Sequence, residues 1–314
     1  MNNYQNIAYG LKQVSLAVCV LAVLLVFLAG CRSSEGIRDT ENEEDKMMQN
    51  YEIEIFCPEE YTEKKADAKY SDVIKVNYYS TTCEKERPVN IILPVGYSEE
   101  KEYPVLYVLH GIFGTQNDMN DNSIIIQNMM TEGNAKDMIV VYPYMYASKT
   151  KDACTAIDKE NVAAYDNFVN DLVTDLMPFI QENYSIAEGR ENTAITGFSM
   201  GGRESLAIGL QRPDLFGYVG AIAPAPGLVP GKDWAMEHEG QFVEDELVFN
   251  DEKPLLLMVC CGDKDGTVGQ FPKSYHDIFV RNKVEHMWWE IPGSDHGNPA
   301  ISSGIYNFCK YIFQ

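Results

Sequence analysis

The hydrophobic positions of this chain fall into short continuous runs and longer periodic stretches, and the two patterns predict different elements. Short apolar runs are typical of strands that are buried on both faces of a parallel sheet. Such runs cover residues 103–109, 138–142, 193–198, 218–223, 254–261 and 286–291. Three earlier segments, 51–56, 71–80 and 87–94, alternate or cluster like strands between charged and Pro/Gly breaks, and we expect them to form an antiparallel edge.

Helical periodicity separates the apolar runs. Residues 158–183 place apolar side chains on one broad face, as in a long amphipathic helix. Further helical patterns cover residues 203–210, 269–282 and 299–312. Strands that alternate with helices through right-handed crossovers predict an α/β fold, a mostly parallel doubly wound sheet with antiparallel N-terminal edge strands.

The first thirty residues have a different pattern. Lys12 is the only charge before an apolar run over residues 14–29, which ends in Leu-Ala-Gly-Cys at Cys31. This is the layout of an export signal, and it resembles a bacterial lipoprotein signal in which Cys31 would be lipidated and become the new N-terminus. A plain transmembrane anchor is the alternative, because the run is near the minimum spanning length. We favour the lipoprotein, since an anchor has no use for a small-small-Cys ending.

The domain organisation that follows is a signal peptide over residues 1–30, an acidic tether over 31–50 and an α/β domain over 51–314. The tether is rich in charge and holds almost no core-forming side chains. The 314 residues include 25 Lys and Arg and 47 Asp and Glu, a net charge of −22. Such a surface argues against nucleic acid and against adsorption to anionic lipid, but leaves a neutral polysaccharide open as a partner.

One of the predicted strands ends at a motif that carries a candidate catalytic serine. Residues 193–198 run into Gly197, Ser199 and Gly201, spaced as G-x-S-x-G, and a helical pattern follows. This spacing is typical of a sharp strand-to-helix turn that exposes a serine hydroxyl in a strained position. The backbone amide of Met200 would then point at the oxyanion of a tetrahedral intermediate, beside the positive end of the helix.

A nucleophilic serine requires an acid and a histidine, each placed after a later strand. Asp263 and Asp265 both follow the strand 254–261, and the spacing from the preceding glycine favours Asp265. His296 lies on a glycine-flanked loop after the strand 286–291, which completes the order Ser, Asp, His. The loop after residue 109 offers a second oxyanion donor, the amide of Ile112.

The remaining histidines and cysteines give weaker signals. We expect His110 to pack below the site and His286 to lie in a strand, whereas His238 and His276 lie on polar segments. No spacing among them suggests a metal site, and a serine nucleophile needs no cofactor. Past Cys31 the cysteines are at positions 57, 83, 154, 260, 261 and 309. A disulfide between the first two is open, and positions 260 and 261 are typical of small core residues.

From about Asp72 to its C-terminus the chain resembles the esterase-D-like branch of the α/β hydrolases, and most closely the feruloyl and acetylxylan esterases of carbohydrate esterase family 1. The resemblance rests on residues 104–118, 142–148, 182–202, 261–270, the loop around His296 and residues 306–313. It implies that Ser199 is the nucleophile, Asp265 the acid and His296 the base, with the amides of Ile112 and Met200 as the oxyanion hole. Related enzymes often carry an aromatic residue where Met119 stands, which leaves the shape of the acyl pocket open.

These features together predict an exported, lipid-anchored serine esterase that removes feruloyl or acetyl groups from plant cell-wall xylan through an acyl-enzyme. Other activities of the same branch are S-formylglutathione hydrolysis, siderophore ester hydrolysis and acyl transfer between sugars. A non-catalytic polysaccharide-binding protein on this fold is a further alternative. Residues 224–253, which include Trp234, either wall the acyl side of the cleft or form a surface excursion with a small core of their own. Of the adjacent Trp288 and Trp289, at least one should be in the core.

Overall fold

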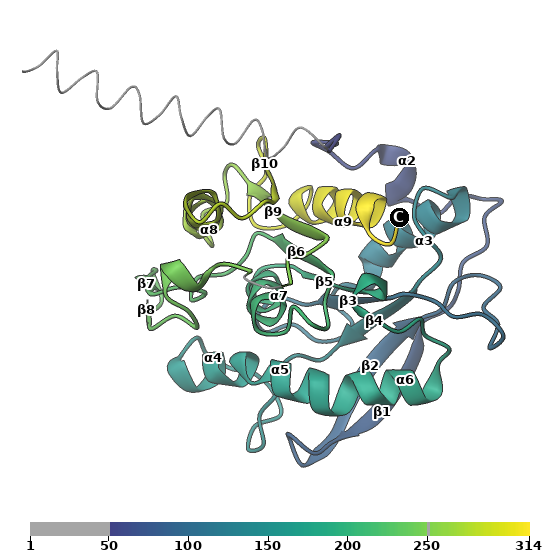
Figure 1. The fold of residues 1–314 in the computed structure, drawn as a ribbon, viewed down its shortest axis with the longest axis horizontal. Helices are drawn as coiled ribbons and strands as arrows, with labels where there is room; N and C mark the ends of the chain where they lie inside the picture. The colour runs from purple at the N-terminus through teal and green to yellow at the C-terminus, as the bar shows by residue number, and fades with distance from the viewer. Residues whose placement is uncertain (1–50, 250–251) are drawn as a thin grey trace, which may run out of the picture. The chain divides into compact units, whose positions relative to one another are not determined.

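An eight-stranded sheet forms the centre of the structure, a computed structural model that describes residues 51–249 and 252–314 (Figure 1). The strand order is β1-β2-β4-β3-β5-β6-β9-β10. The strands are β1 (Ile74–Ser80), β2 (Lys85–Ile92), β3 (Val105–Leu109), β4 (Ile139–Pro143), β5 (Thr193–Gly197), β6 (Tyr218–Ile222), β9 (Leu256–Gly262) and β10 (Met287–Ile291). Strand β2 is antiparallel to β1 and β4, and the remaining pairs are parallel. The predicted fold class is therefore confirmed, with β1 and β2 as the antiparallel edge.

Helices cover both faces of this sheet (Figure 1). One face packs against α4 (Lys159–Asp166), α5 (Phe168–Asp171), α6 (Met177–Asn183), α7 (Met200–Gln211) and α8 (Phe271–Arg281). The other face packs against α3 (Ser123–Glu132) and α9 (Ala300–Tyr311), near the short α2 (Glu59–Thr62). Side chains of β3 alternate between the two cores, with Tyr107 in one and Leu106 in the other. Burial on both faces explains why the strand sequences are continuously apolar.

The long helix predicted over residues 158–183 is present, but it is not one regular α-helix. A π-helical turn, η2 (Leu172–Leu176), separates α5 from α6, and the amide of Met177 donates to the carbonyl of Leu172. Pro178 follows directly. Proline has no N–H to donate, and its ring crowds the carbonyl four residues earlier, so the widened turn removes a contact that a regular helix would force.

The predicted strand over residues 51–56 is wrong. This segment forms no strand and lies along α9, where the amide of Glu52 donates to the Tyr311 hydroxyl at 2.7 Å and the amide of Glu54 donates to Asn307 Oδ1 at 3.0 Å. Tyr51 and Ile53 pack against the core. The alternation of apolar and polar residues in this segment therefore comes from packing against a helix, which produces the same period as packing in a sheet.

One helix was not predicted from the sequence, and one expectation about buried side chains can be compared with the structure. Helix α3 was not predicted, although its C-terminus at Gly133 has the left-handed conformation that commonly ends a helix. Trp289 is buried, and its indole N–H donates to Ser303 Oγ at 3.1 Å, while Trp288 packs against the opposite core. The expectation that at least one of the two tryptophans belongs to the core is confirmed.

The N-terminal predictions lie outside the described residues. The signal peptide, the lipidation site at Cys31 and the acidic tether all fall within residues 1–50, so they stay predictions. In the part of the chain that the structure does describe, no helix is long and apolar enough to cross a lipid bilayer.

Candidate active site

Ser199 occupies a sharp turn between β5 and α7. Its backbone has φ 58° and ψ −117°, on the left-handed side that non-glycine residues rarely adopt. Two backbone hydrogen bonds hold it there: its amide donates to the carbonyl of Ile222 at 2.9 Å, and its carbonyl accepts from the amide of Ala225 at 3.0 Å. Strand β6 and the loop that follows it therefore fix the strained serine in place.

The two flanking glycines are required by close backbone contacts. A Cβ atom at Gly197 would lie 2.5 Å from the carbonyl carbon of Gly201. A Cβ atom at Gly201 would lie 2.4 Å from the carbonyl oxygen of Leu109, at the end of β3. No side chain fits such distances, so the G-x-S-x-G spacing follows from the packing of α7 onto β5 and β3.

The predicted serine, histidine and aspartate meet in one hydrogen-bonded line. His296 Nε2 lies 2.9 Å from Ser199 Oγ, and His296 Nδ1 lies 2.7 Å from Asp265 Oδ2. Because the carboxylate can only accept, the proton of the neutral imidazole lies on Nδ1 and leaves Nε2 free to accept from the serine hydroxyl. The ring of Phe198 packs against the imidazole, with ring centroids 4.5 Å apart.

The acid of this line is Asp265 and not Asp263. Besides His296, Asp265 accepts at Oδ1 from the amides of Thr267 and Val268, at 3.0 and 3.1 Å, and its side chain is almost fully buried. Asp263 Oδ1 accepts from the amide of Gly293 at 2.6 Å, so this second carboxylate fastens the neighbouring turn instead. The preference for Asp265 drawn from the glycine spacing agrees with this geometry.

The two predicted oxyanion donors lie beside the serine. A Cβ atom at Gly111 would be only 3.5 Å from Ser199 Cβ, so the turn that carries Ile112 passes directly against the nucleophile. Met200 is the first residue of α7, where backbone amides have no partner within the helix. Within the described part of the chain, neither amide has a hydrogen-bond acceptor. Met119 is buried in the core.

The other histidines are buried, including two that the sequence places on polar segments. His110 packs below the site as expected, at 1% exposure. His238 and His276 are also buried, although the segments that carry them are polar in sequence. His276 Nδ1 lies 2.8 Å from His286 Nε2, and burial lowers the pKa of each to about 4. His286 precedes β10 by one residue instead of lying within it.

The long segment over residues 224–253 contributes to the main core instead of forming a small core of its own, and its predicted role as a wall of the acyl side of the cleft stays a prediction. Leu228 and Leu247 are fully buried in the main core, so the segment is partly structural. Between them lies a hairpin of β7 (Gly231–Lys232) and β8 (Glu237–His238), whose Trp234 is 72% exposed. The Trp234 indole N–H donates to the carbonyl of Thr267 at 3.3 Å, which places it beside the loop of Asp265.

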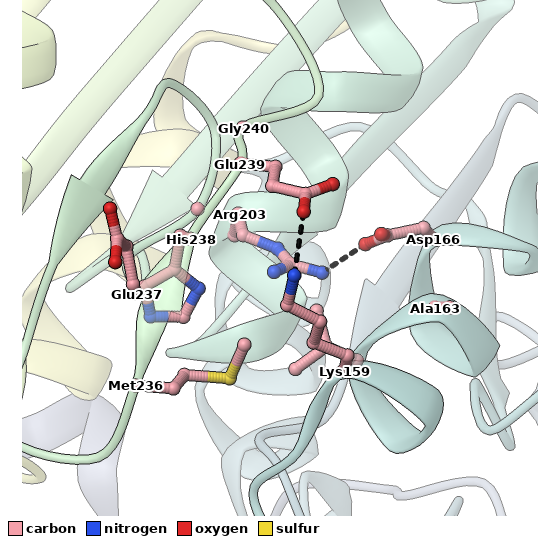
Figure 2. A pocket seen from close by; sticks show the side chains of 11 residues that line it. Lys159, Ala163, Asp166, Arg203, Met236, Glu237, His238, Glu239 and Gly240 are labelled. Carbon is pink, nitrogen blue, oxygen red and sulfur yellow. Dashed lines mark hydrogen bonds and ion pairs between the residues drawn. The ribbon is translucent and has the colours of Figure 1, made fainter.

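A polar pocket of about 170 Å³ lies between α4 and this hairpin (Figure 2). The buried guanidinium of Arg203 lies in its wall and pairs with both Asp166 and Glu204. Lys159 and Glu239 form an ion pair at 2.6 Å, also seen in Figure 2. Arg203 follows Ser199 by one helical turn, so this cluster joins the nucleophile helix to α4.

Burial raises the pKa of Asp166 to about 7, and the neighbouring Glu204 adds to the rise while Arg203 opposes it. A folded state with a raised carboxyl pKa keeps a proton that the unfolded chain releases. The free energy of unfolding should therefore fall as the pH rises from about 4 to about 7, and then level off. Asp166→Asn removes this dependence, and urea unfolding at pH 5 and pH 7.5 measures it.

The matched control is Asp214→Asn at the surface. Arg212 lowers the pKa of Asp214, so the stabilisation by this pair is present above the unfolded pKa and is lost only in more acidic solution. The control should keep the wild-type slope between pH 5 and pH 7.5. Equal slopes for wild type and Asp166→Asn would contradict the raised pKa.

The six cysteines past residue 50 are all free thiols, so the disulfide left open between Cys57 and Cys83 is not formed. Among residues 51–249 and 252–314, no group of three or more His, Cys, Asp or Glu side chains is placed to hold a metal ion.

Comparison with known proteins shows the family to which this chain belongs. Residues 80–303 match the family model Esterase, described as "Putative esterase". Among solved structures, the CE1 ferulic acid esterase of Anaeromyces mucronatus, in complex with ferulic acid, is 48% identical. The alignment covers 84% of this chain and 98% of that one, with a TM-score of 0.81.

Curated relatives match over part of their length. An endo-1,4-beta-xylanase/feruloyl esterase of Xylanibacter ruminicola is 27% identical over 65% of this chain, and an acetyl esterase of Caldicellulosiruptor saccharolyticus is 26% identical over 50%. This chain spans 26% of the first relative and 57% of the second. With its α/β-hydrolase fold and its Ser-His-Asp line, the chain belongs to the esterase family of serine carboxylic-ester hydrolases, and within it to the CE1 branch of the ferulic acid esterases.

Proposed function

We propose that this protein is a serine esterase that hydrolyses feruloyl esters on plant cell-wall xylan, with acetyl esters as the other candidate substrate. The observation that carries the proposal is the hydrogen-bonded line of Asp265, His296 and Ser199 in a chain that aligns over nearly the whole length of a CE1 ferulic acid esterase. The acidic surface supports a neutral glycan as the partner, because it repels nucleic acid and anionic lipid.

The reaction follows from the positions of the protons. Ser199 Oγ attacks the ester carbonyl carbon while its proton passes to His296 Nε2. Asp265 holds the imidazole through Nδ1 and stabilises the imidazolium that forms. The amides of Ile112 and Met200 donate to the oxyanion of the tetrahedral intermediate.

Collapse of this intermediate forms the acyl-enzyme. The carbon–oxygen bond to the sugar breaks, and His296 gives its proton to the departing alcohol. A water molecule then loses a proton to the same histidine and attacks the acyl carbon, which releases the carboxylic acid and restores the Ser199 hydroxyl. Every proton moves through His296, so the reaction requires no cofactor.

Side-by-side turnover of methyl ferulate, p-nitrophenyl acetate, acetylated xylan and S-formylglutathione tests the substrate. We expect release of ferulate or acetate from the first three, with a higher kcat/KM than for the glutathione ester. Preference for the glutathione ester would favour the S-formylglutathione hydrolase alternative. Binding to xylan with no turnover of any ester would contradict the proposal and favour the non-catalytic binding protein.

We further propose that the protein is exported and held at the bacterial cell envelope by a lipid on Cys31. The support is the sequence alone: an apolar run over residues 14–29 that ends in Leu-Ala-Gly-Cys, followed by a charged tether.

Metabolic labelling with a palmitate analogue tests this attachment on the full chain. The wild-type protein should carry the label and sediment with membranes, whereas Cys31→Ser should lose the label. If Cys31→Ser stays in the membrane and the wild type carries no label, the N-terminal run is a transmembrane anchor and the lipoprotein proposal fails.

A further inference from the structure

His110 lies directly beneath the turn that carries a predicted oxyanion donor. The turn follows β3 and includes Gly111, Ile112 and Gly114. The His110 ring is 1% exposed, and the proposed mechanism gives it no part. Its two nitrogens nevertheless each make a short contact with backbone, at 2.7 Å to the carbonyl of Gly111 and 3.0 Å to the amide of Met145.

These two contacts settle the position of the ring proton. A backbone amide can only donate, so Nε2 of His110 accepts from Met145 and carries no proton. The proton of the neutral ring is therefore on Nδ1, which donates to the carbonyl of Gly111. Burial lowers the pKa of His110 to about 4, so the ring stays in this one neutral form at neutral pH.

The carbonyl of Gly111 and the amide of Ile112 belong to the same peptide unit. In a planar trans peptide the C=O and N–H bonds point in opposite directions. The carbonyl is held by His110 and also by the amide of Gly114 at 3.1 Å. The N–H of Ile112 must then point away from the His110 ring. The turn that carries it passes against the nucleophile, because a Cβ atom at Gly111 would lie 3.5 Å from Ser199 Cβ.

We propose that His110 is a positioning residue for the oxyanion hole: its Nδ1–H holds the Gly111 carbonyl and so turns the Ile112 amide towards the oxyanion formed at Ser199. The inference deepens the proposed ester hydrolysis, because it concerns the same site. It needs no particular acyl group.

The surroundings of His110 keep its ring in place. The ring of Tyr144 stacks on it, with centroids 5.6 Å apart and planes at 20°. The Arg87 guanidinium lies 5.5 Å from the centroid of Tyr144 and donates to the carbonyls of Tyr144 and Tyr146. Tyr165 meets His110 edge-on, and its hydroxyl accepts from the amide of Phe113 in the same turn. The imidazole therefore has one available orientation.

Two substitutions of His110 separate its two contacts. Asparagine places an amide nitrogen near the position of Nδ1 and can still donate to Gly111, but it cannot reach Met145. Glutamine reaches Met145 with its oxygen, but has no donor for Gly111. If His110 positions the oxyanion hole, His110→Gln should lower kcat on p-nitrophenyl acetate by about 10- to 100-fold with little change in KM. This loss is smaller than the one caused by removing an oxyanion donor outright. His110→Asn should recover most of that loss.

Thermal unfolding and boronate binding complete the test. Both variants should unfold at a lower temperature than the wild type, so a loss of stability alone would lower kcat in both. Phenylboronic acid forms a tetrahedral adduct with an active serine, and its affinity should fall for His110→Gln in proportion to kcat, while the affinity for ferulate is unchanged. Because this adduct needs no turnover, it tests the inference even if the feruloyl activity proves wrong.

Three results would overturn the inference. The first is an equal kcat loss in His110→Asn and His110→Gln. The second is unchanged boronate affinity in His110→Gln. The third is a ¹⁵N spectrum of the wild-type protein that places the His110 proton on Nε2.

Discussion

Ser199→Ala lowers kcat for p-nitrophenyl acetate by at least about 10⁴-fold, if the hydrogen-bonded line acts as a nucleophile and base. In the proposed mechanism this hydroxyl forms the bond to the acyl carbon. Its loss leaves His296 with no alcohol to deprotonate. A fluorophosphonate probe supplies a second measurement, because it should label the wild type at this serine and leave the variant unlabelled.

Ser98→Ala provides the matched control for this substitution. Ser98 lies in the connection between β2 and β3, where its hydroxyl only accepts from the amide of Glu100 at 3.2 Å. The same chemical change there should leave kcat and labelling at the wild-type level. Residual turnover by Ser199→Ala within tenfold of the wild type, after purification away from host esterases, would contradict the assignment of the nucleophile.

Asp265→Asn is expected to lower kcat by about 10³- to 10⁴-fold, with the fold intact. The carboxylate accepts from His296 Nδ1 at 2.7 Å and from two backbone amides at its other oxygen. Those two amides will still donate to the side-chain oxygen of the asparagine, so its NH₂ group faces the imidazole. Two donors cannot share a hydrogen bond, so the ring is driven to the tautomer with its proton on Nε2, where it cannot accept from Ser199.

Asp263→Asn is the control, since it makes the same change two residues away. An asparagine there can still accept from the amide of Gly293, so kcat should stay within about threefold of the wild type. The pH dependence of kcat/KM for the two variants is the measurement. If Asp263→Asn proves the more damaging variant, then Asp265 is not the residue that orients His296.

The three side chains could be placed from sequence because each follows a strand with a clear apolar run. The carboxyl ends of parallel strands meet at one edge of the sheet, so Ser199, Asp265 and His296 were all expected at that edge. The spacing from a glycine also favoured Asp265 over Asp263. At these positions the apolar run of each strand and the predicted parallel sheet led to the same edge, and both could be inferred from the sequence.

Other features depend on contacts that no local pattern reveals. Arg203 and Asp166 pair across 37 positions, and a helical pattern alone shows neither that the arginine is buried nor which acid it meets. The role inferred for His110 depends on which atoms face its two ring nitrogens. The segment 51–56 misled because packing against a helix produced the alternation expected of a strand. Each of these requires the three-dimensional neighbours of the residue.

The hydrogen bonds between residues 51–55 and α9 determine where this domain can be cut. Ser303 and Asn307 are fully buried, and both bond to the backbone of Glu54 across about 250 positions of sequence. The family match over residues 80–303 stops inside α9, which begins four positions after His296. A recombinant fragment trimmed to those limits would lose most of that helix together with its N-terminal cover. Expression of the isolated enzyme should therefore begin no later than Tyr51 and continue to the last residue.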